Sequence, residues 1–184
     1  MEFLSRHLAQ ICLQDLKSFP ILTLTGPRQS GKSTLLKKLL PDWRYVSLED
    51  PSHNDFAAGD PVGFLQTYSD KVVFDEIQRA PKLLSSIQVE VDRDRRPGRF
   101  ALSGSHNLLL LEQVSQTLAG RTSVRHLLPF SYSELNAHGR SFPMIEETLF
   151  FGAYPPVIDA PEAAVSWLGS YIQTYIEQIG RAHV

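Results

Sequence analysis

The sequence has few of the features that mark secreted, metal-stapled or membrane proteins. Cys12 is the only cysteine among 184 residues, which excludes a disulfide within the chain and a cysteine-based zinc site. The six histidines show no spacing typical of metal ligands. No apolar run approaches the roughly 18 residues of a membrane span, and no signal-peptide pattern begins the sequence. These absences predict a cytoplasmic protein with no membrane partner.

An excess of charge of one sign is also lacking. The formal net charge is −2, so bulk attraction to nucleic acid or to anionic lipid is not indicated. The one basic cluster, residues 93–96, is interrupted by Asp94 and is typical of a solvated helix end. The length fits one domain, or one domain and the start of a second.

What the sequence does contain is an alternation of strand and helix patterns. Several strand segments are apolar without interruption, which is typical of strands covered on both faces. The alternation predicts an α/β fold, with a mostly parallel five-stranded sheet covered by helices on both faces. Strands are expected at 21–25, 45–48, 72–74, 99–102 and 122–128. Helices are expected at 2–18, 33–40, 62–68, 83–95, from 131 onward, and at 163–177.

A complete phosphate-binding motif follows the first strand. Residues 26–33 match G-x-x-x-x-G-K-S/T between an apolar strand and a helix, the context in which this motif binds phosphate. Its glycines let backbone N–H groups turn toward phosphate oxygens, beside the positive end of the helix dipole. Lys32 is expected to reach the β- and γ-phosphates, and the Ser33 hydroxyl to ligate Mg²⁺. The alternative is a glycine turn with a solvated lysine. The predicted nucleotide-binding residues are Gly26, Pro27, Arg28, Gln29, Ser30, Gly31, Lys32, Ser33 and Thr34.

Two acids end the third predicted strand. Asp75, at the carboxyl end of that strand, is expected to hold Mg²⁺ beside Ser33. Glu76 is expected to polarise the attacking water as general base. Adjacent Asp and Glu favour ATP hydrolysis over a small-molecule kinase, in which the acceptor is a substrate hydroxyl.

Three further residues are candidates for catalysis. Ser103 and Ser105 end the fourth strand, where a polar side chain can sense the γ-phosphate or orient the water; a simple turn is the alternative. Arg121 can stabilise transition-state charge in cis or from a neighbouring subunit. The alternative for Arg121 is a surface salt bridge.

Five segments in this order resemble one family: residues 26–35, 73–81, 102–105, 118–121 and 128–135. Together they resemble the prokaryotic AAA+-like ATPases, in which a P-loop core precedes a C-terminal domain of unknown function. The resemblance implies an AAA+-type core that binds ATP and Mg²⁺, with Lys32, Ser33, Asp75 and Glu76 in the roles given above. It supports Ser103 and Ser105 as the sensor region and does not decide the role of Arg121. It suggests roles in DNA transactions or defence without naming a substrate.

The resemblance also implies how the chain is divided into domains. Residues 1–151 are expected to form the P-loop ATPase core with its N-terminal helix, and residues 152–177 a linker and the first helix of a further domain. Members of the family continue for about as many residues again. Residues 178–184 resemble a translated sequencing adapter and are expected to be a non-native tail.

Two functions are compatible with these residues. In the first, ATP hydrolysis drives a conformational change in an attached domain or partner. In the second, nucleotide occupancy gates binding to DNA or a defence partner with little turnover. A DNA or protein partner would bind through the further domain, and an arginine acting between subunits would require a homo-oligomer.

Overall fold

The computed structural model describes residues 3–105, 112, 114 and 116–181. The chain divides into two compact units, one of His7–Leu128 and the other of Met1–Arg6 with Pro129–Val184. The expected boundary between residues 151 and 152 therefore falls inside the second unit. Each unit is described below by itself.

The first unit is built on a five-stranded parallel sheet with the order β2-β3-β4-β1-β5. β1 and β3 are buried along their whole length, as their apolar sequences predict. β4 lies between β1, which leads into the P-loop, and β3, which ends at Asp75 and is followed by Glu76. The strands are β1 (Ile21–Gly26), β2 (Arg44–Ser47), β3 (Val72–Asp75), β4 (Phe100–Ser105) and β5 (Thr122–His126).

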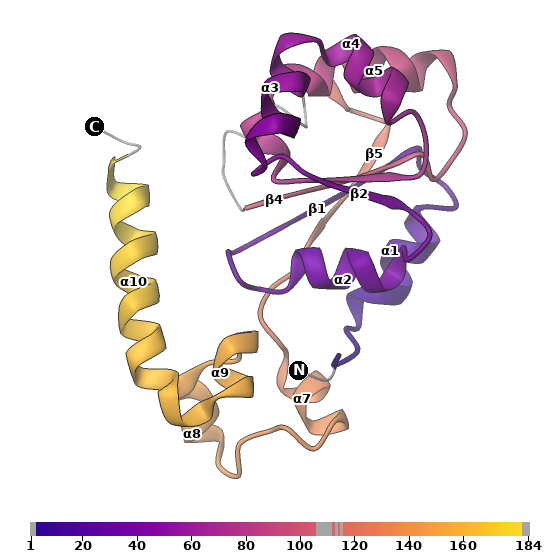
Figure 1. Cartoon of the computed structure of the whole chain (residues 1–184). Helices are drawn as coiled ribbons and strands as arrows, with labels where there is room; N and C mark the ends of the chain where they lie inside the picture. The colour runs from indigo at the N-terminus through magenta and orange to yellow at the C-terminus, as the bar shows by residue number, and fades with distance from the viewer. Residues whose placement is uncertain (1–2, 106–111, 113, 115, 182–184) are drawn as a thin grey trace. The chain divides into compact units, whose positions relative to one another are not determined.

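Helices cover both faces of this sheet, as predicted. α1 (Leu8–Asp15) and α2 (Lys32–Leu39) lie on one face, and α3 (Pro51–Gly59), α4 (Pro61–Thr67) and α5 (Lys82–Arg93) on the other (Figure 1). A short 3-10 helix, η1 (Ile77–Arg79), follows β3. Asp50 and Asp60 cap α3 and α4, each before a proline in the first turn. The core on the α3–α5 side is aromatic, with Phe74 stacked on Phe100 and tilted against Phe64.

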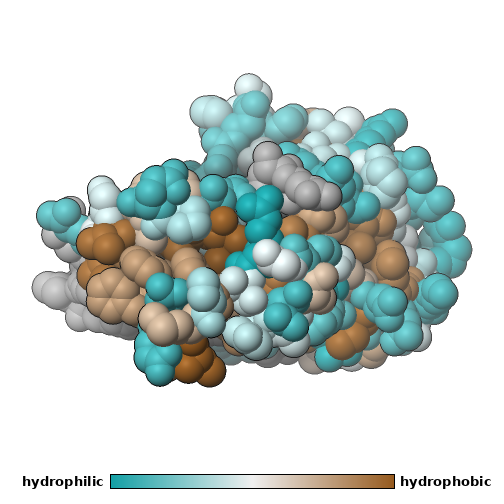
Figure 2. Space-filling view, turned by 90° about the horizontal axis from the view of Figure 1, so that it is seen from below, coloured by the Kyte–Doolittle hydropathy of each residue, from teal (hydrophilic) through white to brown (hydrophobic). Residues whose placement is uncertain are grey.

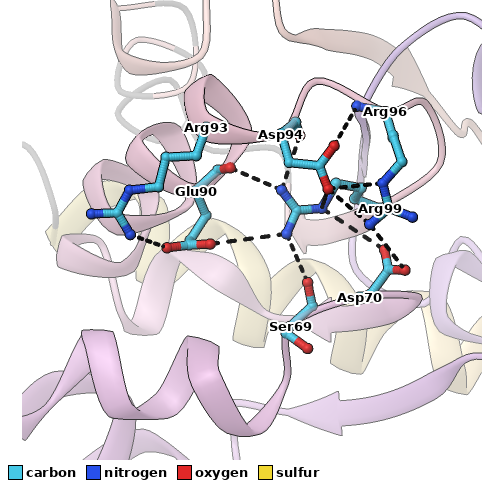
Figure 3. Close-up of polar contacts among 7 residues, drawn as sticks. All are labelled: Ser69, Asp70, Glu90, Arg93, Asp94, Arg96 and Arg99. Atoms are coloured by element: carbon cyan, nitrogen blue, oxygen red, sulfur yellow. Dashed lines mark hydrogen bonds and ion pairs between the residues drawn. The ribbon is translucent and has the colours of Figure 1, made fainter.

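A buried arginine organises the amino end of the sheet. Arg99, which immediately precedes β4, is 5% exposed. Its guanidinium donates to the backbone carbonyls of Glu90, Asp94 and Ser69 at 2.8–3.0 Å (Figure 3). The carboxylates of Asp70, Glu90 and Asp94 lie within 3.8–4.0 Å of the same group. Arg99 thus joins the segment before β3, the end of α5 and the start of β4.

The N-terminal helix is shorter than the predicted 2–18, because α1 begins at Leu8. Residues 5 and 6 belong instead to the second unit, and they contact other residues of that unit. The Ser5 hydroxyl bonds the His138 ring at 2.8 Å. Arg6 pairs with Glu134 at 3.2 Å and covers the Phe130 ring. Both charged side chains are almost fully buried, and separating such a pair would leave a charge unpaired inside the protein. The free-energy cost of separating Arg6 from Glu134 is larger than the gain from extending α1 to residues 5 and 6.

The second unit is helical. A capping box of Ser131 and Glu134 starts α7, where a helix was expected from residue 131 onward. Its helices are α7 (Tyr132–Ala137), α8 (Ile145–Phe151), α9 (Pro155–Asp159), the 3-10 helix η2 (Pro161–Ala163) and α10 (Ala164–Arg181). α10 corresponds to the predicted helix at 163–177 and extends into the expected tail, of which residues 182–184 lie outside the described residues.

Apolar side chains are exposed on this unit. Leu149 and Phe150 of α8 are 79% and 70% exposed, and Val165 of α10 is 63% exposed. Brown apolar surface is visible at the left of Figure 2. Among the described residues, no helix combines the length and apolar character needed to cross a membrane.

Candidate functional site

The P-loop connects β1 to α2, and its backbone conformation depends on its glycines. Gly26 has φ +151°, and a Cβ there would lie 2.2 Å from the Leu127 carbonyl oxygen. Gly31, at the N-terminus of α2, has φ +94°, which is left-handed backbone that side chains disfavour. Gln29 also has positive φ, at +61°. Conformations of this kind turn successive N–H groups toward one side, as a phosphate cradle requires.

The side chains of the loop differ in their surroundings. Pro27 is half-buried, Arg28 and Gln29 are exposed, and Ser30 is buried. Ser33 is half-buried in the first turn of α2, and Thr34 next to it is exposed.

Lys32 is buried inside this loop, with 5% of its surface exposed. Its ammonium donates to the carbonyls of Gly26 at 3.0 Å and Pro27 at 2.9 Å. Burial lowers the pKa of Lys32, while the nearby carboxylates of Glu76 and Asp75 act in the opposite direction. The ammonium therefore lies within the loop, close to the acids that end β3.

The Asp75 carboxylate accepts hydrogen bonds from hydroxyl groups on three elements, α2, β2 and β4. The Ser33 hydroxyl donates to Oδ2 at 2.7 Å, which joins α2 to the end of β3. The Tyr45 hydroxyl donates to the same oxygen, and the buried Ser103 hydroxyl donates to Oδ1. The structure thus brings Lys32, Ser33, Asp75 and Ser103 together at the carboxyl end of the sheet.

The donor set at Asp75 fits Mg²⁺. A carboxylate and a serine hydroxyl are hard oxygen ligands, and Mg²⁺ in phosphoryl-transfer sites takes few protein ligands and keeps water and phosphate oxygens for the rest. In the described part of the chain no group of three or more His, Cys, Asp or Glu side chains could form an all-protein metal cage. Ser33 and Asp75 are therefore the residues that could hold the ion together with a nucleotide.

Tyr45 was not predicted as a site residue. It lies on β2, where its neighbour across the sheet is Val73, two residues before Asp75. That diagonal distance is within reach of an aromatic side chain. The Lys37 ammonium lies 3.9 Å from the centre of its ring. Burial, together with the hydrogen bond to Asp75, raises the pKa of the Tyr45 hydroxyl, so it stays protonated and donates.

Glu76 directly follows β3 in an unusual conformation. Its φ and ψ are +57° and +47°, a left-handed conformation that is uncommon for a residue other than glycine. The side chain is half-buried. Its carboxylate accepts a hydrogen bond from the amide nitrogen of Gln78, which also donates to Ser105 Oγ at 3.2 Å. Gln78, left without a role in the sequence analysis, thus links Glu76 to Ser105.

Arg121 is not brought to this site. It immediately precedes β5, so it lies at the amino end of the sheet, whereas the P-loop and the two acids lie at the carboxyl end. Its guanidinium makes two hydrogen bonds to Asp92, at 2.9 and 2.8 Å. This placement gives no support to a role in cis. A role from a neighbouring subunit remains a prediction.

A family model described as an AAA domain matches residues 18–136. This chain belongs to that AAA domain family. The match covers the strands, the P-loop and the acid pair, so the unit described above is a nucleotide-binding domain of the AAA-type P-loop fold.

The AAA chain is also similar to curated proteins of two mycobacteria. An uncharacterized protein of Mycobacterium tuberculosis and one of Mycobacterium bovis are each 32% identical over 164 residues, which is 86% of this chain. The matched region is 36% of the length of each relative, so the AAA chain spans about a third of these proteins.

Solved structures share the fold at low sequence identity. The Walker-type ATPase Paby2304 of Pyrococcus abyssi aligns with a TM-score of 0.65 and 15% identity, covering 98% of this chain and 77% of its own. DnaA of Aquifex aeolicus, bound to AMPPCP, aligns with a TM-score of 0.57 and 14% identity, covering 95% and 67%. These similarities show a common P-loop α/β fold.

Proposed function

We propose that the AAA chain binds ATP with Mg²⁺ and hydrolyses it, and that turnover changes the conformation of an attached domain or partner. The observation that carries this proposal is the 2.7 Å hydrogen bond from Ser33 to Asp75, with Glu76 adjacent. It places the two predicted Mg²⁺ ligands in contact although they are 42 residues apart in sequence.

In this proposal each residue has one task. The loop N–H groups and Lys32 bind the phosphates and offset the charge that develops on the γ-phosphoryl group. Ser33 and Asp75 hold Mg²⁺, which when bound neutralises charge on the β- and γ-oxygens. The Ser103 hydroxyl orients the Asp75 carboxylate by donating to its other oxygen.

Glu76 is proposed to accept a proton from the attacking water. It is the acid nearest to Asp75 in sequence, and its carboxylate accepts a hydrogen bond from Gln78. A positioned general base contributes about 10²- to 10⁴-fold to a rate, so this role is large enough to measure.

Membership of the AAA domain family supports a nucleotide ligand, and the resemblance described in the sequence analysis supports ATP as that nucleotide. The mycobacterial relatives, of whose length this chain covers 36%, have room for a further domain on which turnover could act. A DNA or protein partner bound through such a domain, and a homo-oligomer, belong to the same proposal.

The test compares Glu76→Gln with the parent chain. ATP affinity, measured by calorimetry with Mg²⁺, should stay within about threefold, while phosphate release should fall by about 100-fold or more. Glu162→Gln, an exposed acid of the second unit, is the matched control and should leave both values unchanged. A parent rate no higher than that of Glu76→Gln would contradict hydrolysis and favour the nucleotide-gated switch.

A further inference from the structure

Gln78 connects Glu76, which directly follows β3, to Ser105, which ends β4. It lies in η1, two residues after Glu76. Its amide nitrogen donates to the Glu76 carboxylate and, at 3.2 Å, to the hydroxyl of Ser105 at the end of β4. One side chain therefore contacts both the proposed base and the predicted sensor serine.

The chemistry of Gln78 matches these two acceptors. A carboxylate only accepts hydrogen bonds, and an amide NH₂ group offers two donors on one atom. Turning the amide over would place its oxygen against the carboxylate, so Glu76 fixes the orientation. As a result Gln78 Oε1 is buried without a hydrogen-bond partner in residues 3–105, 112, 114 and 116–181. A glutamine that only filled space would be expected to satisfy both ends of its amide.

Glu76 needs such a contact. Its backbone is in the left-handed conformation, and its side chain has three rotatable bonds and is only half-buried. Packing alone therefore restrains the carboxylate weakly. A base that must meet a water at hydrogen-bond distance gains from a fixed orientation, because a misplacement of about 1 Å can cost about 100-fold in rate.

The two serines of β4 are linked by hydrogen bonds to different acids. Ser103 donates to Asp75, the proposed metal ligand, whereas Ser105 accepts from Gln78, which in turn donates to Glu76. The end of β4 therefore reaches the metal carboxylate directly and the base through one intervening side chain.

We propose that Gln78 is a positioning residue that fixes the Glu76 carboxylate and ties its orientation to Ser105 at the end of β4. This inference rests on the proposed hydrolysis, in which Glu76 is the base. It assigns to Gln78 no contact with the nucleotide, so its removal should affect the chemical step and leave ground-state binding intact.

The first measurement is a double-mutant cycle on the 184-residue chain with Gln78→Met, which keeps the length of the side chain and removes its hydrogen bonds. Gln78→Met should lower the rate of phosphate release by about 10- to 100-fold. In the Glu76→Gln background the same change should alter the residual rate by less than about twofold, because Gln78 acts through Glu76. Gln88→Met, at a half-buried glutamine of α5, is the matched control and should not change the rate.

The second measurement is independent of turnover. Affinity for ADP with Mg²⁺ should change by less than about twofold in Gln78→Met, as measured by calorimetry. Affinity for ADP with Mg²⁺ and aluminium fluoride, a mimic of the transferring phosphoryl group, should fall by about tenfold because Glu76 no longer positions the water.

The outcomes separate this inference from the function on which it rests. If the parent hydrolyses ATP no faster than Glu76→Gln, the proposed hydrolysis fails and the role of Gln78 fails with it. If the parent is faster than Glu76→Gln but Gln78→Met equals the parent, only the role of Gln78 is overturned. A loss of equal size in both backgrounds, or a weaker affinity for ADP with Mg²⁺, would show that Gln78 is merely structural and would also overturn it.

Discussion

The two ends of the parallel sheet each bury a cation, and they surround it with different groups. At the amino end, Arg99 is bonded to three carbonyls and lies near three carboxylates. At the carboxyl end, Lys32 donates to two carbonyls of its own loop. Both side chains are about 5% exposed, so burial alone does not separate the two ends.

The difference lies in the groups around the charge. Arg99 has acids on several sides and joins three segments, as a stabilising residue does (Figure 3). Lys32 and the loop around it present donors that a polyphosphate can use. Functional sites commonly retain arrangements that do not maximise stability. We therefore expect substitutions at the amino end to change stability and those at the carboxyl end to change binding.

The largest effect is expected for Lys32→Ala. Calorimetry should show that affinity for ATP with Mg²⁺ falls by about 1000-fold or more, which corresponds to about 4 kcal/mol. The free energy of unfolding should fall by less than in Arg99→Met, because Lys32 has two carbonyl partners whereas Arg99 has three carbonyls and three nearby carboxylates. Lys38→Ala, an exposed lysine of the same helix, is the control. Unchanged affinity in Lys32→Ala would contradict the whole assignment of the site.

Arg99→Met, in contrast, should lower the stability of the protein and leave its affinity for nucleotide unchanged. Removing the guanidinium leaves several carbonyls and carboxylates without their partner, so the free energy of unfolding should fall by about 3–5 kcal/mol. Denaturant unfolding measures this change, and the affinity of the folded fraction for nucleotide should stay the same. Arg93→Met, which removes an exposed pair with Glu90, should cost less than about 0.5 kcal/mol. A loss below 1 kcal/mol in Arg99→Met would remove the distinction between the two ends.

Tyr45→Phe is expected to have an intermediate effect. The quantity that should change is the affinity for Mg²⁺ at the carboxyl end of the sheet. It deletes the hydroxyl that donates to Asp75 and keeps the ring under Lys37. Groups that orient a metal ligand typically contribute 10- to 100-fold to metal affinity. We expect the Mg²⁺ concentration for half-maximal nucleotide binding to rise by about tenfold, with nucleotide affinity in EDTA unchanged. Tyr132→Phe, an exposed tyrosine of α7, serves as control, and an unaltered Mg²⁺ midpoint in Tyr45→Phe would show that Asp75 does not need this hydroxyl.

The smallest effect is expected for Arg121→Ala. Its partner Asp92 is at the amino end, and such a partly exposed pair contributes at most about 1 kcal/mol. Phosphate release should therefore stay within about twofold of the parent. A drop of more than tenfold that depends on protein concentration would instead support a role of Arg121 in a neighbouring subunit.

Local sequence signals predicted the strands and several helix boundaries. The glycines of the P-loop, Asp60 before Pro61, and the Ser131–Glu134 capping box each encode a backbone conformation within a few residues. Asp50 before Pro51 carries the same signal as Asp60, yet the helix it starts, α3, was not predicted. The N-terminal helix was predicted too long because a contact 128 residues away, from Arg6 to Glu134, competes with it.

The sequence indicated candidate residues that are consecutive in the chain, but it did not indicate those that become neighbours only across the sheet. Tyr45 was missed because nothing near it in sequence shows that β2 lies beside β3. Gln78 was not assigned a role because its second acceptor, Ser105, is 27 residues away. The position of Arg121 could have been predicted from the sequence. A residue that immediately precedes a parallel strand lies at the end of the sheet opposite to the P-loop.

The sequence by itself determined the conformation of the P-loop and the place of the acid pair, because glycines fix the conformation of a contiguous loop and an apolar run fixes where a strand ends. Only the tertiary structure decided that Ser33, Tyr45 and Ser103 share one carboxylate, and that Gln78 joins Glu76 to Ser105. The physical reason is that strand order sets which side chains become neighbours, and strand order depends on packing across the whole sheet.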